Sequence, residues 1–402
     1  MPPPQTRATA PARKRQPHGR RIRSVSGYWA YLPAPLPPPI EWSAKLAAGL
    51  SEADRAVGRL AGEGRRLANP HLLVRPFVRR EAVMSSRIEG TQATLGELLA
   101  AEAGAAVDRS PDDLREVGNY VVALEQGVKR LRDLPLSLRL VRELHGALMR
   151  GVRGDTATPG EFRRTQIWIG RPGSTLANAT YVPPPPDRLM ECLGPWEIFL
   201  HDRSLPPLVH AALAHAQFEA IHPFLDGNGR VGRLLITLLL VERAILPTPL
   251  LYLSAYFEAS RREYYVRLLA LTEEGAWGEW LDYFLQGVAE QAEDALGRIQ
   301  RIDELLARWR DELAGTTSRL PERALELFVS NPFWSVGRLA ERTRVAFTTA
   351  QRAIDRLESA GIVSLATEAK RNRVYCARAI LEILEEPSHP DTDHGRHRTA
   401  RA

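Results

Sequence analysis

Helical periodicity runs through most of the chain and constrains its fold more than any other feature. Apolar residues recur at spacings of three and four with polar residues between them, the pattern of helices that bury one face. The predicted helices span residues 43–60, 79–88, 114–132, 136–149, 187–201, 206–221, 229–244, 261–272 and 276–310. Patterns typical of strands occupy only two short regions, so the sequence predicts a mainly α fold.

The first strand-like region interrupts the helices between Gly160 and Pro186. β-Forming side chains alternate along residues 165–169, and a second short stretch, Tyr181 and Val182, precedes four consecutive prolines. An Arg-Pro-Gly-Ser sequence lies between these two stretches. Two short strands joined by turn-forming residues predict a β-hairpin. We expect this hairpin to project from the helical body as a flap.

Size and composition narrow the class of protein. The chain has 402 residues, of which 44% are hydrophobic and 25% are charged, a balance that suits two or three ordinary globular domains. Its longest uncharged apolar run, residues 234–241, is far shorter than the roughly 20 residues that span a bilayer, which excludes a transmembrane protein. Cys192 and Cys376 are too few for a disulfide framework or a four-ligand zinc site, so we expect a cytoplasmic location.

The net charge of +6 originates in the first 27 residues, which hold seven basic residues and no acidic one. Without these seven, the 54 basic residues fall to 47 against 48 acidic residues, so the folded part is expected to be near neutral. This proline-rich tail also lacks the apolar stretch of a signal peptide. It predicts a disordered extension, with a tether for nucleic acid or a membrane as the alternative.

The second strand-like region lies in a small separate domain after a predicted linker at residues 315–318. Helical patterns at 321–330, 336–343 and 348–360 precede an alternating stretch at 361–377, the order of a winged helix. Ten basic and six acidic residues between 322 and 378 favour DNA binding, whereas such domains also dock on proteins. The predicted DNA contacts are Thr348, Thr349, Gln351, Arg352 and Arg356 on the third helix and Lys370, Arg371 and Arg373 on the wing.

These patterns divide the chain into six parts. They are a disordered basic tail (1–27), an N-terminal helical part (28–112), a helical core (113–290), a connecting helix and linker (291–319), a winged-helix domain (320–384) and a second disordered tail (385–402).

Groups suited to phosphate chemistry gather in residues 221–233, whose sequence is IHPFLDGNGRVGR. The Gly-Asn-Gly sequence at 227–229 opens a predicted helix, where backbone N–H groups and the helix dipole can hold phosphates. Arg230 and Arg233 lie one turn apart on one face of that helix, so each guanidinium can bind phosphate oxygens. The absence of Gly-Lys-Ser or Gly-Lys-Thr in this stretch argues against a P-loop.

Two further residues complete this candidate site. Asp226 stands just before the loop, where a carboxylate can hold a magnesium ion that bridges the phosphates. His222 is the candidate base. Each residue alone also fits a turn, a helix cap or a packed core, but their combination within twelve residues favours a functional site.

The stretch from His222 to Arg233 resembles the signature of the Fic family, H-P-F-x-[DE]-G-N-G-R-x-x-R, at every fixed position. The resemblance implies a helical Fic core whose members mostly transfer AMP from ATP to a Ser, Thr or Tyr hydroxyl of a target protein. It implies that His222 takes the proton of the attacking hydroxyl and that Asp226 coordinates Mg²⁺. It further assigns the phosphates to Gly227, Asn228, Gly229, Arg230 and Arg233, and implies that the target pairs with the 160–186 flap as an added strand.

Tyr264 and Tyr265 are similar to a tyrosine pair that lines the nucleotide pocket in some Fic members. Thr272 stands where relatives can carry an asparagine, so the adenine contacts of this chain differ from that pattern. The alternative is that both tyrosines are core aromatics of a helix.

Residues 85–90, Ser-Ser-Arg-Ile-Glu-Gly, fit the inhibitory pattern [ST]-x-x-x-E-[GN] of the same family. Ser85 and Glu89 lie at i and i+4, on one face of a helix that ends at Gly90. The resemblance implies that Glu89 pairs with Arg233 and denies it to the γ-phosphate of ATP. The alternative is a surface glutamate near a helix end.

We therefore expect an autoinhibited protein adenylyltransferase that requires ATP and Mg²⁺. Two alternatives keep the same site: removal of AMP by water that Glu89 positions, or use of another phosphate-containing donor. A further alternative is a DNA-binding transcriptional regulator whose Fic part senses nucleotide. The expected partners are a target protein, DNA at the winged helix and a second copy of the chain, with no membrane.

Overall fold

Helices form most of the chain, and the prediction of a mainly α fold is confirmed. The computed structural model describes residues 17–66, 69–152, 158–246, 249–314, 318–367 and 373–388. Before the C-terminal region its helices are α1 (Ala44–Arg66), α2 (Pro70–Ile88), α3 (Leu95–Glu102), α4 (Pro111–Arg130), α5 (Leu138–Leu148), η1 (Pro186–Arg188), α6 (Leu189–Leu200), α7 (Pro207–Ile221), α8 (Asn228–Glu242), α9 (Ser254–Ala259), α10 (Arg261–Glu274) and α11 (Trp277–Glu312). None of the helices in these ranges is long and apolar enough to cross a membrane.

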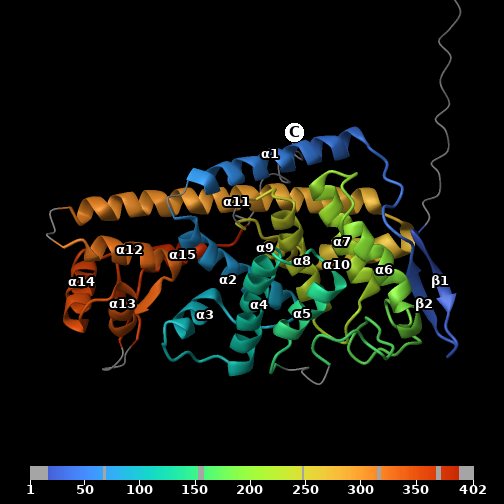
Figure 1. Cartoon of the computed structure of the whole chain (residues 1–402), viewed down its shortest axis with the longest axis horizontal. Coiled ribbons are helices and arrows are strands. Elements are labelled where there is room, and N and C mark those ends of the chain that lie inside the picture. The colour runs from blue at the N-terminus through green and yellow to red at the C-terminus, as the bar shows by residue number, and fades with distance from the viewer. Residues whose placement is uncertain are drawn as a thin grey trace, which may run out of the picture.

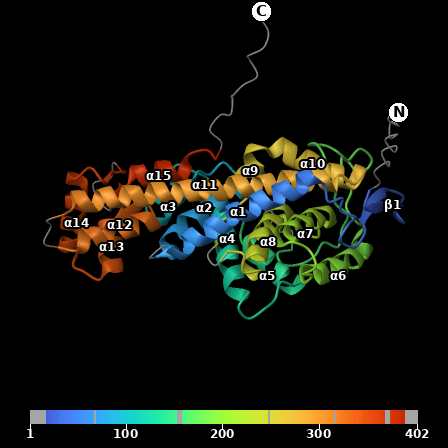
Figure 2. The same ribbon diagram turned by 90° about the horizontal axis from the view of Figure 1, so that it is seen from above.

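The 36-residue helix α11 runs along the long axis of the molecule, with α1 beside it (Figure 1, Figure 2). The two helices are parallel, because Lys45 pairs with Asp282 at 2.6 Å and Arg59 pairs with Glu293 farther along both. Each buries an apolar stripe against the other and against the helices below. Together they form a long support for the rest of the fold.

Helices α7 and α8 form the centre of the core. Apolar side chains cover nearly all sides of both helices, and such helices are stable only when they are surrounded. The indole N–H groups of Trp196 on α6 and Trp280 on α11 donate to the carbonyls of Ala214 (2.9 Å) and Ala212 (3.0 Å) on α7. These bonds fix α7, whose last turn leads into the 221–233 segment.

Helix α2 packs against α4, α9 and α12 (Leu320–Ser330). It begins nine residues earlier than predicted, with Pro70 at its first position, and it continues through Pro76. Its Glu81 side chain is buried and accepts hydrogen bonds from Tyr120 of α4 at 3.0 Å and from the Ser254 main-chain N–H at 3.1 Å. This network fixes the position of α2 against the core.

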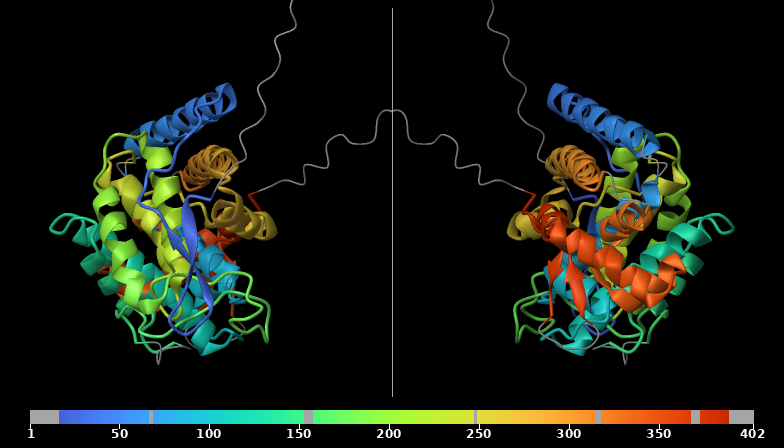
Figure 3. Two further views of the ribbon diagram at one scale, coloured as in Figure 1. Left: turned by 90° about the vertical axis from the view of Figure 1, so that its right-hand side faces the viewer. Right: turned by 90° about the vertical axis from the view of Figure 1, so that its left-hand side faces the viewer.

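The predicted disordered tail at 1–27 is wrong for its last part. Strand β1 (Gly19–Arg23) pairs antiparallel with β2 (Trp29–Pro33), so that Arg21 faces Tyr31 across the hairpin. Ala30, Tyr31 and Leu32 of β2 are buried, whereas Trp29 is exposed, and β1 is held as the partner of β2 at one end of the molecule (Figure 3). Residues 1–16 of that prediction lie outside the described residues.

The predicted flap at 160–186 contains much less β structure than expected. A single antiparallel bridge joins Ile169 and Tyr181, with N–H to carbonyl distances of 2.8 and 3.0 Å. Turns fill the residues between them, and the prolines that follow supply no N–H for a longer ladder. The segment is an ordered loop closed by one bridge, and the Tyr31 N–H joins it to β2 through the carbonyl of Val182 at 2.9 Å.

The C-terminal region occupies the other end of the molecule (Figure 3). It contains α12 (Leu320–Ser330), β3 (Phe333–Ser335), α13 (Val336–Thr343), α14 (Phe347–Ser359), β4 (Ser364–Leu365), β5 (Val374–Cys376) and α15 (Arg378–Glu385). The three helices followed by two antiparallel strands agree with the predicted element order, whereas β3 and α15 were not predicted. β3 completes a three-stranded sheet in the order β3-β5-β4. The Glu385 carboxylate accepts the main-chain N–H of Gly96 at 2.8 Å, so this region contacts α3 directly.

Candidate active site

The loop between α7 and α8 has a backbone that only particular residues allow. Gly227 caps α8 with a φ of +76°, and a Cβ there would lie 2.9 Å from the sulfur of Met149. Asn228 does not extend into open space: its Oδ1 accepts the main-chain N–H of Phe224 at 2.8 Å and its Nδ2 donates to the carbonyl of Phe224 at 2.9 Å. Asn228 therefore shapes the loop, which leaves the backbone N–H groups at the start of α8 as the candidate donors for an anion.

His222 follows the last residue of α7 in a left-handed conformation with a φ of +49°. Its Nδ1 lies 3.2 Å from the carbonyl oxygen of Glu219. Because a carbonyl only accepts, Nδ1 carries the proton and Nε2 is left unprotonated in the neutral ring. Burial lowers the pKa of His222 to about 4, so the ring is neutral at pH 7 and Nε2 can accept a proton.

Arg163 fixes this strained turn, although sequence reasoning did not single it out. Its Nε donates to the His222 carbonyl at 2.8 Å, its main-chain N–H donates to the Pro223 carbonyl at 2.9 Å, and its Nη2 reaches Pro184 O at 2.5 Å. The side chain is 2% exposed. One buried guanidinium thus joins the flap segment to the backbone of the candidate base.

His145 of α5 supports the loop through a hydrogen bond to Asp226 and a stacking contact with Phe224. Its Nδ1 accepts the N–H of Gly160 at 2.8 Å, so its Nε2 carries the proton and donates to the carbonyl of Asp226 at 3.1 Å. The ring stacks on Phe224 with 3.7 Å between centroids. Burial lowers the pKa of His145 to about 4, which keeps this ring neutral and holds the hydrogen-bond pattern.

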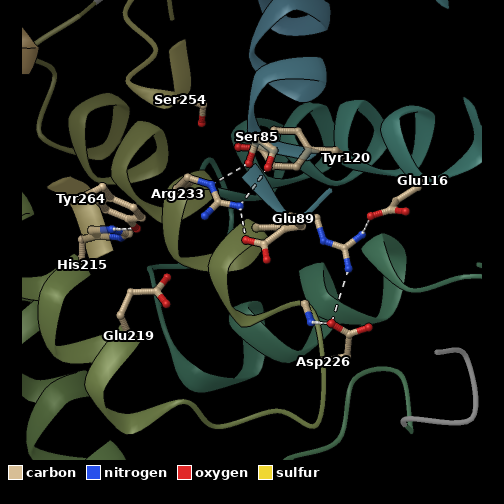
Figure 4. Close-up of polar contacts among 12 residues, drawn as sticks. Ser85, Glu89, Glu116, Tyr120, His215, Glu219, Asp226, Arg233, Ser254 and Tyr264 are labelled. Atoms are coloured by element: carbon tan, nitrogen blue, oxygen red, sulfur yellow. Dashed lines mark hydrogen bonds and ion pairs between the residues drawn. The ribbon is translucent and has the colours of Figure 1, made fainter. Parts of the chain in front are cut away.

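Both arginines of α8 are buried and engaged by side chains of α2 and α4. Figure 4 shows Arg233 with its partners Ser85 and Glu89. Arg233 donates from Nε to Ser85 Oγ at 2.9 Å, and from Nη2 to Ser85 O at 3.0 Å and Glu89 Oε1 at 2.6 Å. Arg230 pairs with Glu116 of α4, and its Nη2 lies 3.7 Å from Asp226 Oδ1. The pairing of Arg230 with Glu116 was not predicted.

The Glu89 carboxylate lies over the start of α8. A Cβ at Gly229 would overlap its Oε1, and that same Cβ would lie 2.8 Å from Nη1 of Arg233. Burial opposes the charge on Glu89, but the Arg233 guanidinium, with a smaller contribution from Arg230, outweighs it and keeps the pKa of Glu89 below its usual value. A negative oxygen thus occupies the place beside the helix N-terminus where a phosphate oxygen would bind.

The two tyrosines of α10 differ from the prediction of a pocket-lining pair. Tyr264 is 1% exposed, stacks on Phe257 and lies 2.8 Å from His215 Nε2 through its hydroxyl, so it belongs to the core. Tyr265 is 44% exposed, and the Arg261 guanidinium lies 6.0 Å from its ring centroid. Only Tyr265 remains available to contact a nucleotide.

The predicted DNA contacts lie far along the chain from this site, on α14 and beyond. Thr348, Thr349, Arg352, Arg356 and Arg373 are exposed, whereas Gln351 is half-buried and donates to Asp355 at 2.7 Å. Arg356 donates to the carbonyl of Glu312 at 3.3 Å, which ties α14 to the end of α11. Lys370 and Arg371 lie outside the described residues.

A neutral histidine at the end of one buried helix and two buried arginines at the start of the next form a candidate anion-binding site in a helical core. The chain matches the Fic/DOC family N-terminal domain over residues 47–129 and the Fic/DOC family over residues 135–240. These two regions therefore contain Fic/DOC family domains.

Known relatives cover part of the chain. The protein adenylyltransferase Fic of Drosophila grimshawi is 34% identical over 194 residues, which are 47% of this chain and 36% of that protein, and the Drosophila virilis protein of the same name matches to the same extent. The matched stretch spans about a third of the length of these relatives. A Fic family protein from Desulfovibrio desulfuricans G20 has a similar fold, with a TM-score of 0.56 and 20% identity over 85% of this chain and 98% of that one.

Proposed function

We propose that this protein transfers AMP from ATP to a hydroxyl group of a target protein. The observation that carries the proposal is the geometry around α8: an unprotonated His222 Nε2 on one side of the loop, and Arg233 with the helix N-terminus on the other. The match of residues 135–240 to the Fic/DOC family supports it. So does the name of the Drosophila relatives, protein adenylyltransferase.

In the proposed reaction the oxygen of the target hydroxyl forms a bond to the α-phosphorus of ATP. The bond from that phosphorus to the oxygen that bridges to the β-phosphate breaks, and pyrophosphate leaves with its electron pair. The hydroxyl proton passes to Nε2 of His222, while backbone N–H groups of the 227–229 loop hold the charged phosphate oxygens. Arg230 and Arg233 would bind the outer phosphates after exchanging their present carboxylate partners.

Asp226 fits the requirement for a magnesium ligand. Its carboxylate is 54% exposed at the edge of the loop and accepts the Gly227 N–H at 2.6 Å. Magnesium in nucleotide sites is usually bound by one or two carboxylates together with phosphates and water, so a lone carboxylate suffices. Across the described ranges no cluster of three metal-binding side chains exists. A bound ion would neutralise phosphate charge, and Asp226 would orient it toward the loop.

Glu89 is proposed to act as a brake on this reaction. Its Oε1 is bonded to Arg233 and lies over Gly229, so ATP and Glu89 compete for the same guanidinium and the same space. Ser85 supports the brake, because its hydroxyl and carbonyl hold the other edge of Arg233. ATP that binds beside Glu89 would have its α-phosphate displaced from the line of attack.

Labelling with ATP that carries the label on its α-phosphate tests the proposed activity. The protein should label itself or a protein in a cell lysate, and His222→Ala should remove the label. Mass spectrometry of the labelled side chain then distinguishes added AMP from a group taken from another donor. Label that persists in His222→Ala would refute the mechanism, and loss of AMP from a premodified protein without forward transfer would favour the removal reaction.

The remaining partners stay predictions. The exposed Trp168 and Ile169 lie at the bridge of the 160–186 segment, where a target could add a strand. We also propose DNA binding through a winged helix in the C-terminal region, which the exposed side chains of α14 and the exposed Arg373 support. A homodimer and a cytoplasmic location follow from the sequence argument only.

A further inference from the structure

A second acidic residue, Glu219, lies next to His222. It stands three residues earlier, in the last turn of α7, and its main-chain carbonyl accepts the Nδ1 proton of His222 at 3.2 Å. Its carboxylate Oε2 lies 3.9 Å from the same Nδ1. Both oxygen groups of one residue thus face the same edge of the imidazole.

The Glu219 carboxyl is enclosed rather than solvated. Its side chain is 12% exposed, and Oε1 is buried with no hydrogen-bond partner among the described residues. A Cβ at Gly232 of α8 would overlap that oxygen, so the glycine provides the space that the carboxyl occupies. Figure 4 shows the carboxyl directed toward Arg233 and Glu89. A buried polar group without a partner is costly and needs an explanation.

Charged and titratable groups from four other parts of the fold surround Glu219 and His222. They are Glu89 of α2, Arg163 of the flap segment, Asp226 and Arg233 around the loop, and Tyr264 and Tyr265 of α10. Burial raises the pKa of Glu219 to about 7, Arg233 opposes this rise and Glu89 adds to it. Glu219 can therefore change its charge near neutral pH, and it ionises more easily once Glu89 has left.

We propose that Glu219 is a positioning residue for His222, whose carboxylate stabilises the imidazolium that forms when Nε2 takes the proton of the target hydroxyl. The inference rests on the proposed transfer of AMP. Burial disfavours a charged His222 ring, so proton transfer to it requires a nearby negative group. The main-chain carbonyl of Glu219 holds the tautomer, and the side chain supplies that charge.

The test compares Glu89→Gly with Glu89→Gly/Glu219→Gln in single-turnover AMP transfer at saturating ATP and Mg²⁺. The glutamine keeps the size of the side chain and removes its charge. We expect the single-turnover rate to fall about 10-fold above neutral pH, while the half-saturating ATP concentration, from a separate titration of ATP, stays within about 2-fold, because the proposed role of Glu219 is toward His222 and not toward ATP. The rate of Glu89→Gly should fall with decreasing pH as Glu219 takes up a proton, at a pH below 7 because Glu89 is absent. This limb should be missing from the double variant.

Glu219→Asp in the same background keeps the charge on a shorter side chain and should restore part of the rate. Titration of ATP itself affects all these proteins equally and cancels in the comparison. Identical pH profiles with and without Glu219 would overturn the inference, as would equal losses in the Asp and Gln variants at every pH. Absence of transfer in Glu89→Gly alone would instead refute the proposed function.

Discussion

Glu89→Gly is the substitution that tests the proposed brake most directly. It removes the hydrogen bond of 2.6 Å between Arg233 and Glu89 and clears the space over Gly229. Arg233 keeps both of its bonds to Ser85, so it is not left unpaired in the core. The cost of the change is therefore smaller than the loss that follows when a buried arginine loses every partner.

The lost hydrogen bond sets the expected size of two effects, a lower free energy of unfolding and a faster transfer of AMP. A hydrogen bond to a charged group contributes about 1.5–3 kcal/mol, and we expect the free energy of unfolding to fall by about that amount. The same interaction becomes available to the γ-phosphate of ATP once Glu89 is gone. If it is realised in the transition state, 1.5–3 kcal/mol corresponds to a rise of about 10- to 150-fold in the rate of transfer.

Glu102→Gly is a matched control for this experiment. Glu102 ends α3 and accepts two hydrogen bonds from Arg79 Nε at 2.9 and 2.8 Å. The Arg79 side chain is 7% exposed and that of Glu102 is 27% exposed, close to the 2% of Arg233 and the 34% of Glu89. The Arg79–Glu102 pair lies on α2 and α3, away from the 221–233 loop. Glu102→Gly should lower stability by a similar amount and leave the rate unchanged.

Single-turnover transfer to an unmodified target and thermal unfolding measure the two effects separately. We expect lower stability in both variants and a faster rate in Glu89→Gly alone. An unchanged forward rate in Glu89→Gly, with ATP bound, would refute the brake. An equal rise in Glu102→Gly would show that loosening of α2, rather than release of Arg233, controls the rate.

Three further substitutions, and one control, test other parts of the protein. In the Glu89→Gly background, His222→Ala should slow transfer by about 10²- to 10⁴-fold, measured by single-turnover kinetics; a smaller loss would mean that another group accepts the proton. Arg163→Met removes the hydrogen bonds to the His222 and Pro184 carbonyls and should reduce both the melting temperature and kcat, whereas Arg164→Met, whose side chain is 86% exposed, should change neither. Burial lowers the pKa of His215 to about 3. Below about pH 6.5 the unfolded chain therefore binds a proton at His215 that the folded protein does not bind, so the free energy of unfolding decreases as the pH falls. In His215→Gln, the free energy of unfolding measured with denaturant should fall less steeply with decreasing pH, by about 1 kcal/mol per pH unit. An unchanged dependence on pH would contradict the low pKa of His215.

Periodicity predicted the long helices because their stability comes from an apolar stripe that the sequence itself displays. It missed α3, α9 and α15, which have only six to eight residues and gain their stability from neighbours distant in the chain. Strand β1 was missed for a related reason. Its arginines resemble a disordered tail, and only pairing with the buried strand β2 gives them a regular conformation.

The candidate site shows a similar division. The 221–233 loop was predictable because all its groups are neighbours in the sequence. Contacts that join distant segments, such as Glu116 with Arg230 and Arg163 with the His222 carbonyl, leave no local pattern. Glu219 did carry a signal, since a predicted helix ending at residue 221 places its carboxyl one turn from His222.

The position of Glu89 at the end of α2 indicates how the brake can open. Glu81, Ser85 and Glu89 lie at four-residue intervals on one face of this helix, and Glu81 is fully engaged by α4 and by the start of α9. Rotation or sliding of the whole helix would break the buried bonds of Glu81, which makes such a movement costly. Glu89 itself follows the last helical residue, precedes Gly90 with its φ of +106°, and is 34% exposed. Helix ends open more readily than helix interiors, so we expect release to involve the last turn of α2 while Glu81 and Ser85 stay in place.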